Sequence, residues 1–163
     1  MEIKIREATI DDIELLLKWR MEVLREVFSL PQDLSLAQLK EENRQYYKKE
    51  LTSNGHIAIF AYIDDQIVGC GGVCLYQEMP SPDNLNGKCA YLMNIYTRSP
   101  YRKHGVGKAI INWLIDRARY QGATKIYLET SVSGKSLYQK NGFVSMGNMM
   151  KLADIKNANK FNQ

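Results

Sequence analysis

A short glycine-containing turn between a strand and a helix is the feature that most limits what this chain can fold into. An apolar segment ending at Thr97 runs into a loop at Pro100, and a helical pattern begins at Gly105. A helix N-terminus has about four N–H groups without partners and about half a positive charge, so it attracts phosphate. The predicted diphosphate-binding residues are Arg102, Lys103, His104, Gly105, Val106, Gly107 and Lys108.

Two better-known phosphate motifs do not fit this turn. The P-loop requires Ser or Thr after its Gly-Lys pair, but Ala109 follows Lys108 here. The dinucleotide fingerprint requires Gly or Ala at its last position, where this chain has Ile110. The glycines at 105 and 107 instead keep side chains away from a diphosphate that approaches the backbone.

Apolar periodicity predicts an α/β chain with the order β-α-α-β-β-β-α-β-α-β. A turn at Asp64–Gln66 makes the second and third strands a hairpin, and glycines 69, 71 and 72 indicate a bulge or a close approach. Thr9 and Asp12 resemble a capping box. The later strand–helix–strand crossover must be parallel and right-handed. Strands are expected over 2–8, 56–63, 67–77, 89–97, 124–130 and 143–152, and helices over about 10–28, 36–53, 105–121 and 134–141.

Length and composition predict one domain over residues 1–152 and a polar C-terminal tail over 153–163. No run reaches the roughly 18 apolar residues that a membrane helix needs, so no membrane association is expected. The N-terminus alternates charged and apolar residues without the apolar core of a signal peptide, which predicts a cytoplasmic protein. Three cysteines and two histidines, without CxxC spacing, indicate reduced thiols and no metal site.

Positive charge is concentrated in one part of the chain. Residues 98–140 carry nine Lys or Arg against Asp116 and Glu129, a net charge of +7, and the rest of the chain sums to −3. Such a segment suits an anionic small ligand or nucleic acid. Because no nucleic-acid-binding module is recognisable, an anionic cofactor is favoured and no nucleic-acid partner is expected.

The turn and a second motif together resemble the GNAT superfamily of N-acetyltransferases. Arg102-x-x-Gly105-x-Gly107 matches the family's acetyl-CoA pyrophosphate motif, and residues 137–143 resemble its LYxKxGF segment about 30 positions later. The resemblance implies a mixed, mostly antiparallel central sheet of six to seven strands flanked by about four helices. It also implies transfer of an acetyl group from acetyl-CoA to a primary amine, without a metal, in a possible homodimer.

The resemblance further implies roles for single residues. Tyr138, the tyrosine of the second motif, is the expected general acid, and the pantetheine arm is expected to pair with the backbone of Ile95, Tyr96 and Thr97. Ser131 stands where many relatives have an Asn that contacts that arm. Glu129 or a water is the expected base. Asn94 replaces a carboxylate found in many relatives, and it could orient a water or the substrate.

Other interpretations of these residues stay open at this point. Tyr138 could be a core tyrosine, Glu129 a surface glutamate and the whole chain a catalytically silent acyl-CoA-binding sensor or interaction module. The family places the acceptor near the first two helices and the loop before the fourth strand, here about 10–53 and 79–88. Candidates to line that region are Trp19, Arg20, Tyr46, Tyr47 and Glu78.

Overall fold

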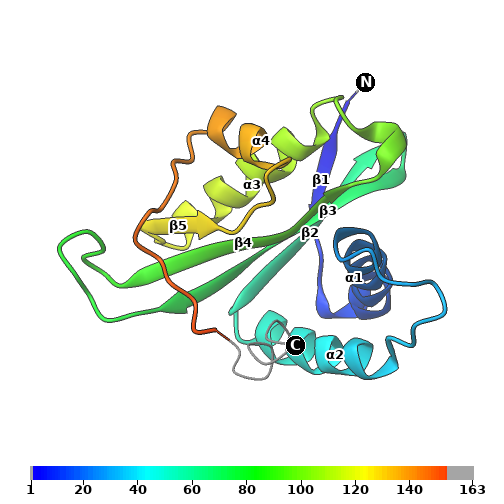
Figure 1. Ribbon diagram of the computed structural model, residues 1–163, viewed down its shortest axis with the longest axis horizontal. Coiled ribbons are helices and arrows are strands. Elements are labelled where there is room, and N and C mark those ends of the chain that lie inside the picture. The colour runs from blue at the N-terminus through cyan, green and yellow to red at the C-terminus, as the bar shows by residue number, and fades with distance from the viewer. Residues whose placement is uncertain (1, 154–163) are drawn as a thin grey trace, which may run out of the picture.

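The computed structural model describes residues 2–153, which form one five-stranded sheet with helices on both faces (Figure 1). The strand order is β1-β2-β3-β4-β5; the first three pairings are antiparallel and β4 with β5 is parallel. The strands are β1 Lys4–Glu7, β2 His56–Ile63, β3 Gln66–Gln77, β4 Lys88–Thr97 and β5 Lys125–Leu128. The helices are α1 Ile13–Val27, α2 Ala37–Thr52, α3 Val106–Tyr120 and α4 Lys135–Lys140, with short 3-10 turns η1 Ile10–Asp12 and η2 Ser99–Tyr101.

Each face of the sheet has its own apolar core. On one face α3 buries Ile110, Ile111 and Leu114 completely, and α4 adds Leu137 at the edge of the same cluster. On the other face α1 and α2 pack over Phe60, with Leu17 fully buried. Burial of each of these large side chains contributes about 1.5–3 kcal/mol. The two cores fix α1 and α3 on opposite sides of β4 (Figure 1).

Local sequence signals explain how several elements begin and turn. The backbone N–H of Thr9 donates to the Asp12 carboxylate at 2.9 Å, and this capping box confirms the predicted helix start. Its first turn is the 3-10 turn η1. The hairpin between β2 and β3 turns at Asp64 and Asp65, whose φ angles of 47° and 60° match a type I′ turn.

The glycine cluster of β3 marks both a bulge and a close approach, as the sequence indicated. Gly72 pairs with Met93 and Cys70 with Tyr96, so two residues of β4, at 94 and 95, lie opposite Gly71. A Cβ at Gly71 would lie 2.6 Å from Ile110 Cγ2, so α3 can pack this close only against glycine. The bulge gives Asn94 a φ of 56° and kinks β4 in its middle.

The expected number of six to seven strands is wrong for the described residues, which form five. The segment 143–152, predicted as a strand, pairs with no neighbour. Phe143 packs partly buried against the core, and the apolar side chains after it are exposed, Val144 at 85% and Met150 at 99%. Its pattern of apolar residues is interrupted by Gly147 and Asn148, which disfavour a strand. The predicted tail from 153 lies, except for its first residue, outside the described residues.

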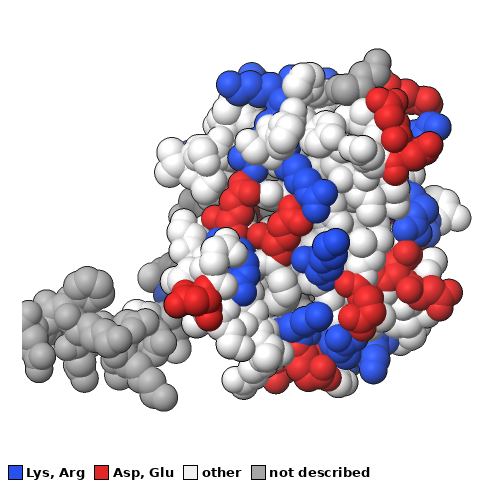
Figure 2. Space-filling model, turned by 90° about the vertical axis from the view of Figure 1, so that its right-hand side faces the viewer, with Lys and Arg blue, Asp and Glu red and all other residues white. Residues whose placement is uncertain are grey.

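The basic segment 98–140 is partly neutralised by acidic side chains from elsewhere in the chain. Four of its cations form ion pairs with glutamates outside the segment: Arg98–Glu22, Arg102–Glu26, Arg117–Glu7 and Lys125–Glu78. Acidic and basic groups are accordingly interspersed on the face shown in Figure 2. The charge asymmetry of the sequence therefore does not become a continuous basic surface on that face.

Candidate active site

The predicted phosphate turn joins the end of β4 to the start of α3. Gly105 caps the helix with a φ of 87°, a left-handed conformation that favours glycine. The N–H of Ala109 donates to the Gly105 carbonyl at 3.0 Å and closes the first helical turn. The N–H groups of residues 106–108 precede it and have no partner within the helix. An anion at this helix start would meet both these donors and the positive end of the helix dipole.

Gly107 faces the wall of α4 closely, and its lack of a side chain keeps the space beside these donors clear. A Cβ there would lie 3.2 Å from Leu137 Cδ2 and 4.0 Å from Thr97 Oγ1. Both neighbours line a cavity with a volume of about 600 Å³. Any side chain at 107 would therefore project into this cavity.

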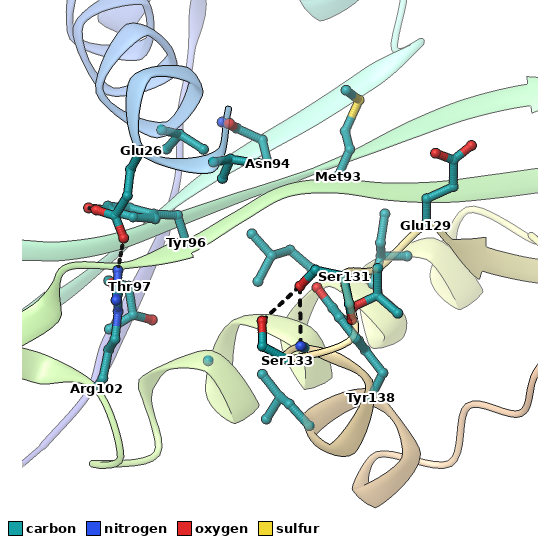
Figure 3. Close-up of a pocket in the computed structure, with 18 of the residues that line it drawn as sticks. Glu26, Met93, Asn94, Tyr96, Thr97, Arg102, Glu129, Ser131, Ser133 and Tyr138 are labelled. Carbon is teal, nitrogen blue, oxygen red and sulfur yellow. Dashed lines mark hydrogen bonds and ion pairs between the residues drawn. The ribbon is translucent and has the colours of Figure 1, made fainter. Parts of the chain in front are cut away.

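The cavity exists because two parallel strands separate. The pairing of β4 with β5 ends at Leu92 and Leu128. Beyond that point, residues 93–97 form one wall, and residues 129–131, 133 and 134 form the other together with Leu137 and Tyr138 of α4. The C-terminal half of α1 closes a third side, as Figure 3 shows for Glu26. The opening leaves the β4 backbone free on the side that faces β5.

Most residues predicted for the site line this one cavity. His104 does not, because its side chain is exposed to solvent, and Val106 does not, because this first residue of α3 is buried in the core with 1% exposed. The predicted residues that do line it are Asn94, Ile95, Tyr96, Thr97, Arg102, Lys103, Gly105, Gly107, Lys108, Glu129, Ser131 and Tyr138. Of the five acceptor-side candidates only Arg20 lines it; Trp19 and Tyr47 are core residues.

Tyr138 projects from α4 toward the gap between the separated strands (Figure 3). Its ring packs edge-on against Phe143 at 5.8 Å between centroids. Burial, and to a smaller extent the neighbouring Tyr91, raise the pKa of the Tyr138 hydroxyl above its usual value of about 10. The hydroxyl therefore remains protonated at neutral pH and can donate a proton.

Glu129 and Asn94 lie on either side of the opening. The Glu129 carboxylate points away from the Tyr138 hydroxyl (Figure 3). The Asn94 amide is engaged on both ends: Oδ1 accepts from Arg20 Nη1 at 3.0 Å, and Nδ2 donates to Cys70 Sγ at 3.8 Å. Neither geometry gives these two residues a direct contact with Tyr138.

Ser131 belongs to a small hydroxyl cluster at the start of α4. Its Oγ lies 3.0 Å from the Oγ of Ser133 and accepts the backbone N–H of Gly134 at 3.3 Å (Figure 3). This turn brings Ser131 and Ser133 into the cavity wall opposite β4. Ser133 was not singled out from the sequence, since a serine in a loop carries no distinctive signal.

Glu26 is a second lining residue that sequence reasoning missed. It forms an ion pair with Arg102, whose Nε also donates to the Thr97 carbonyl at 2.8 Å. One helical turn earlier, Glu22 pairs with Arg98 at 2.7 Å. The two glutamates are four positions apart, and so are the two arginines. This equal spacing is visible in the sequence and could have indicated the two ion pairs.

No group of three His, Cys, Asp or Glu side chains in the described part is arranged to hold a metal. Within residues 2–153, no helix combines the length and the apolar character needed to cross a membrane. The three cysteines are free thiols, with Cys70 and Cys89 buried.

Comparison with known proteins decides the family. The model of the acetyltransferase (GNAT) family matches residues 19–143, which is more than half of the chain. The chain belongs to this family. The match covers the phosphate turn, the separated strands and α4. The family resemblance inferred from the two motifs is thus confirmed, and so is the mixed α/β fold.

Curated relatives of this GNAT chain are N-acetyltransferases. It is 30% identical over 105 residues to N-alpha-acetyltransferase 50 of Danio rerio, which is 62% of this chain and 58% of that protein. It is 29% identical over 104 residues to human N-acetyltransferase 8, which is 61% of this chain and 44% of that protein. The matched region thus spans about half the length of these relatives.

Solved structures share the fold over nearly the whole GNAT domain. A predicted acetyltransferase from Clostridium acetobutylicum, determined with acetyl-CoA, has a TM-score of 0.82 at 24% identity and covers 93% of this chain and 96% of its own. A GCN5-related N-acetyltransferase from Ralstonia eutropha has a TM-score of 0.79 at 23% identity, with coverages of 93% and 99%.

Proposed function

We propose that this protein is an acetyl-CoA-dependent N-acetyltransferase that acetylates a primary amine by direct attack on the thioester. One observation carries the proposal: an open helix start, a free strand backbone and a protonated tyrosine all face the same cavity of about 600 Å³. Family membership supports acetyl transfer, and the names of the curated relatives specify transfer to nitrogen.

The residues present suit acetyl-CoA. Because Gly107 has no side chain, a diphosphate in the cavity could reach the N–H groups of residues 106–108, with Lys103 and Lys108 also lining the cavity. The backbone of Ile95–Thr97 has no strand partner on the side of β5, so an amide-bearing arm could pair with it there as another strand would. Acetyl-CoA would then supply the activated acetyl group beside the bulge of β4.

Acyl transfer forms a C–N bond and breaks the C–S bond of the thioester. The attacking amine must first lose a proton, which Glu129 or a water accepts. The β4 bulge leaves backbone out of the ladder beside the cavity, where an N–H group can stabilise negative charge on the acyl oxygen. Tyr138 donates its proton to the departing sulfur and recovers one from solvent. Since Glu129 points away from Tyr138, we favour water as the base.

A catalytically silent acyl-CoA-binding module is the second candidate. The observation that favours it is that β4 offers the amide of Asn94, engaged by Arg20, where a carboxylate base would be expected. Such a module would bind CoA without turnover. A positioned, protonated Tyr138 is not needed for binding alone, and this favours the enzyme.

Thiol release from acetyl-CoA in the presence of an amine panel tests the proposal. The panel contains amino acids, amino sugars, aminoglycosides, polyamines and peptides, and mass spectrometry checks each product for one added acetyl group. We expect turnover with at least one amine class and none without protein. CoA binding without turnover across the panel would support the silent module. Absence of both would refute the assignment of the cavity.

A further inference from the structure

The guanidinium of Arg20 lies in the cavity wall next to the bulge of β4. Its Nη1 donates to Asn94 Oδ1 at 3.0 Å, and its Nε donates to Asn43 Oδ1 at 3.2 Å. The residue is half-buried and lines the same cavity as Tyr138. Two amide oxygens, one from α2 and one from β4, therefore fix the orientation of this cation.

Arg20 has no anionic partner among residues 2–153. The two glutamates that follow it on α1 already have cationic partners, since Glu22 pairs with Arg98 and Glu26 pairs with Arg102. Neutral amide oxygens offset only part of the cost of withdrawing a cation from water. A guanidinium held in this way retains N–H donors that can take a carboxylate or a phosphate with two parallel hydrogen bonds.

The position of Arg20 separates it from the diphosphate turn. Its partner Asn94 lies in the bulge and precedes Thr97 by three residues along β4. The diphosphate turn lies beyond Thr97, where Lys103 and Lys108 line the cavity. Arg20 thus lies beside the bulge, at the end of the cavity where the acetyl group is proposed to react.

We infer that Arg20 is a specificity-determining residue that binds an anionic group on the acceptor. The acceptor would be a small primary amine with a carboxylate or a phosphate within a few bonds of its nitrogen. This inference rests on the proposed function, because it places the acceptor amine beside the β4 bulge. Hydrogen bonds to charged groups make the expected preference about 10- to 100-fold over a neutral amine of the same shape.

Matched pairs of amines test this inference. Phenylalanine is compared with 2-phenylethylamine, and O-phosphoethanolamine with ethanolamine; the first pair tests a carboxylate and the second a phosphate. Two readouts are used: kcat/KM with acetyl-CoA, and calorimetric binding of the same amines to CoA-saturated protein. The binding readout does not require turnover. A failure of catalysis is therefore distinguishable from a failure of anion recognition.

Substitutions of Arg20 separate recognition from a structural role. R20Q should remove the preference for the anionic member of a pair and leave the neutral member and CoA affinity within about threefold, and R20K should keep part of the preference. K18Q removes an exposed charge from the same helix and should change nothing. Equal binding of anionic and neutral amines by the wild type would overturn the inference. An equal loss for both members in R20Q would also overturn it, since Arg20 would then only position Asn94.

Discussion

The hydroxyl of Tyr96 donates a 2.5 Å hydrogen bond to Oε2 of Glu26, and the same carboxylate forms an ion pair with Arg102. The hydrogen bond from Tyr96, followed by that from Arg102, lowers the pKa of Glu26 below its usual value. A negative charge is therefore held at neutral pH beside the turn proposed to bind a diphosphate. The Glu26 carboxylate also takes a hydrogen bond from the guanidinium of Arg102, the residue that the family motif places at that turn.

We predict that Glu26→Gln strengthens CoA binding about two- to tenfold, because it removes a like charge and releases Arg102. The range reflects the modest energy of partly exposed ion pairs, about 0.5–1.4 kcal/mol. Calorimetry with CoA at low salt measures the change. Glu14→Gln is the control. Glu14 lies at the other end of α1, where it pairs with Arg44 of α2, and its substitution should leave CoA affinity unchanged. Weaker binding in the Glu26 variant would mean that this carboxylate instead positions Arg102 for the ligand.

Tyr138→Phe should lower kcat at least about 100-fold, the usual contribution of a general acid. CoA affinity should change little, because the ring and its packing on Phe143 remain. The raised pKa of Tyr138 keeps its hydroxyl protonated, so wild-type kcat should show no fall from its ionisation below about pH 10. Tyr120→Phe, on an exposed tyrosine at the end of α3, is the matched control. A kcat in Tyr138→Phe within threefold of wild type would remove Tyr138 from the chemistry.

Glu129→Gln should retain more than a tenth of wild-type kcat, because its carboxylate points away from Tyr138 and water is the favoured base. The measurement is the pH dependence of kcat/KM for the best amine of the panel. Wild type and variant should show the same acidic limb. A fall of 100-fold or more, with loss of that limb, would identify Glu129 as the general base.

Acid sensitivity should depend on His56, which is 5% exposed under α2. Burial, with a smaller effect of the Arg20 charge, lowers the pKa of His56 to about 4. Between pH 6.5 and 4 the unfolded chain binds a proton that the folded chain does not. The stabilisation is thus complete above about pH 6.5 and is lost as pH falls. From pH 7 to pH 5, wild type should lose about 2 kcal/mol more unfolding free energy than His56→Gln. Urea denaturation at the two pH values measures this; equal losses would contradict it.

Most of the fold follows from patterns within single elements. The strand predicted over 56–63 matches β2, and the helix predicted over 105–121 exceeds α3 by one residue at each end. The strand predicted over 143–152 is wrong, because apolar residues alone do not decide whether a segment pairs with a neighbouring strand. Beyond Phe143, its apolar side chains are exposed instead.

The site residues that belong to local sequence motifs could be predicted, because the backbone of the turn and of α4 sets their position. The glycines of the turn and the tyrosine of α4 face one cavity, as expected from their motifs. Side-chain partners across the fold could not be predicted in this way. The pairing of Glu26 with Arg102 joins residues 76 positions apart, and that of Arg20 with Asn94 joins residues 74 apart. Such contacts depend on how α1 crosses β4, and periodicity within one element does not contain that information.

Calorimetric titration of CoA into wild type and Gly107→Val tests whether a diphosphate binds at the start of α3. Gly147→Val, at a glycine with open space around it, is the control. Gly107→Val should weaken CoA binding at least about tenfold, a loss of about 1.4 kcal/mol or more. Gly147→Val should bind like wild type, and pantetheine, which lacks the diphosphate, should bind all three proteins weakly. CoA affinity unchanged in a folded Gly107→Val protein would contradict binding of the diphosphate at the start of α3.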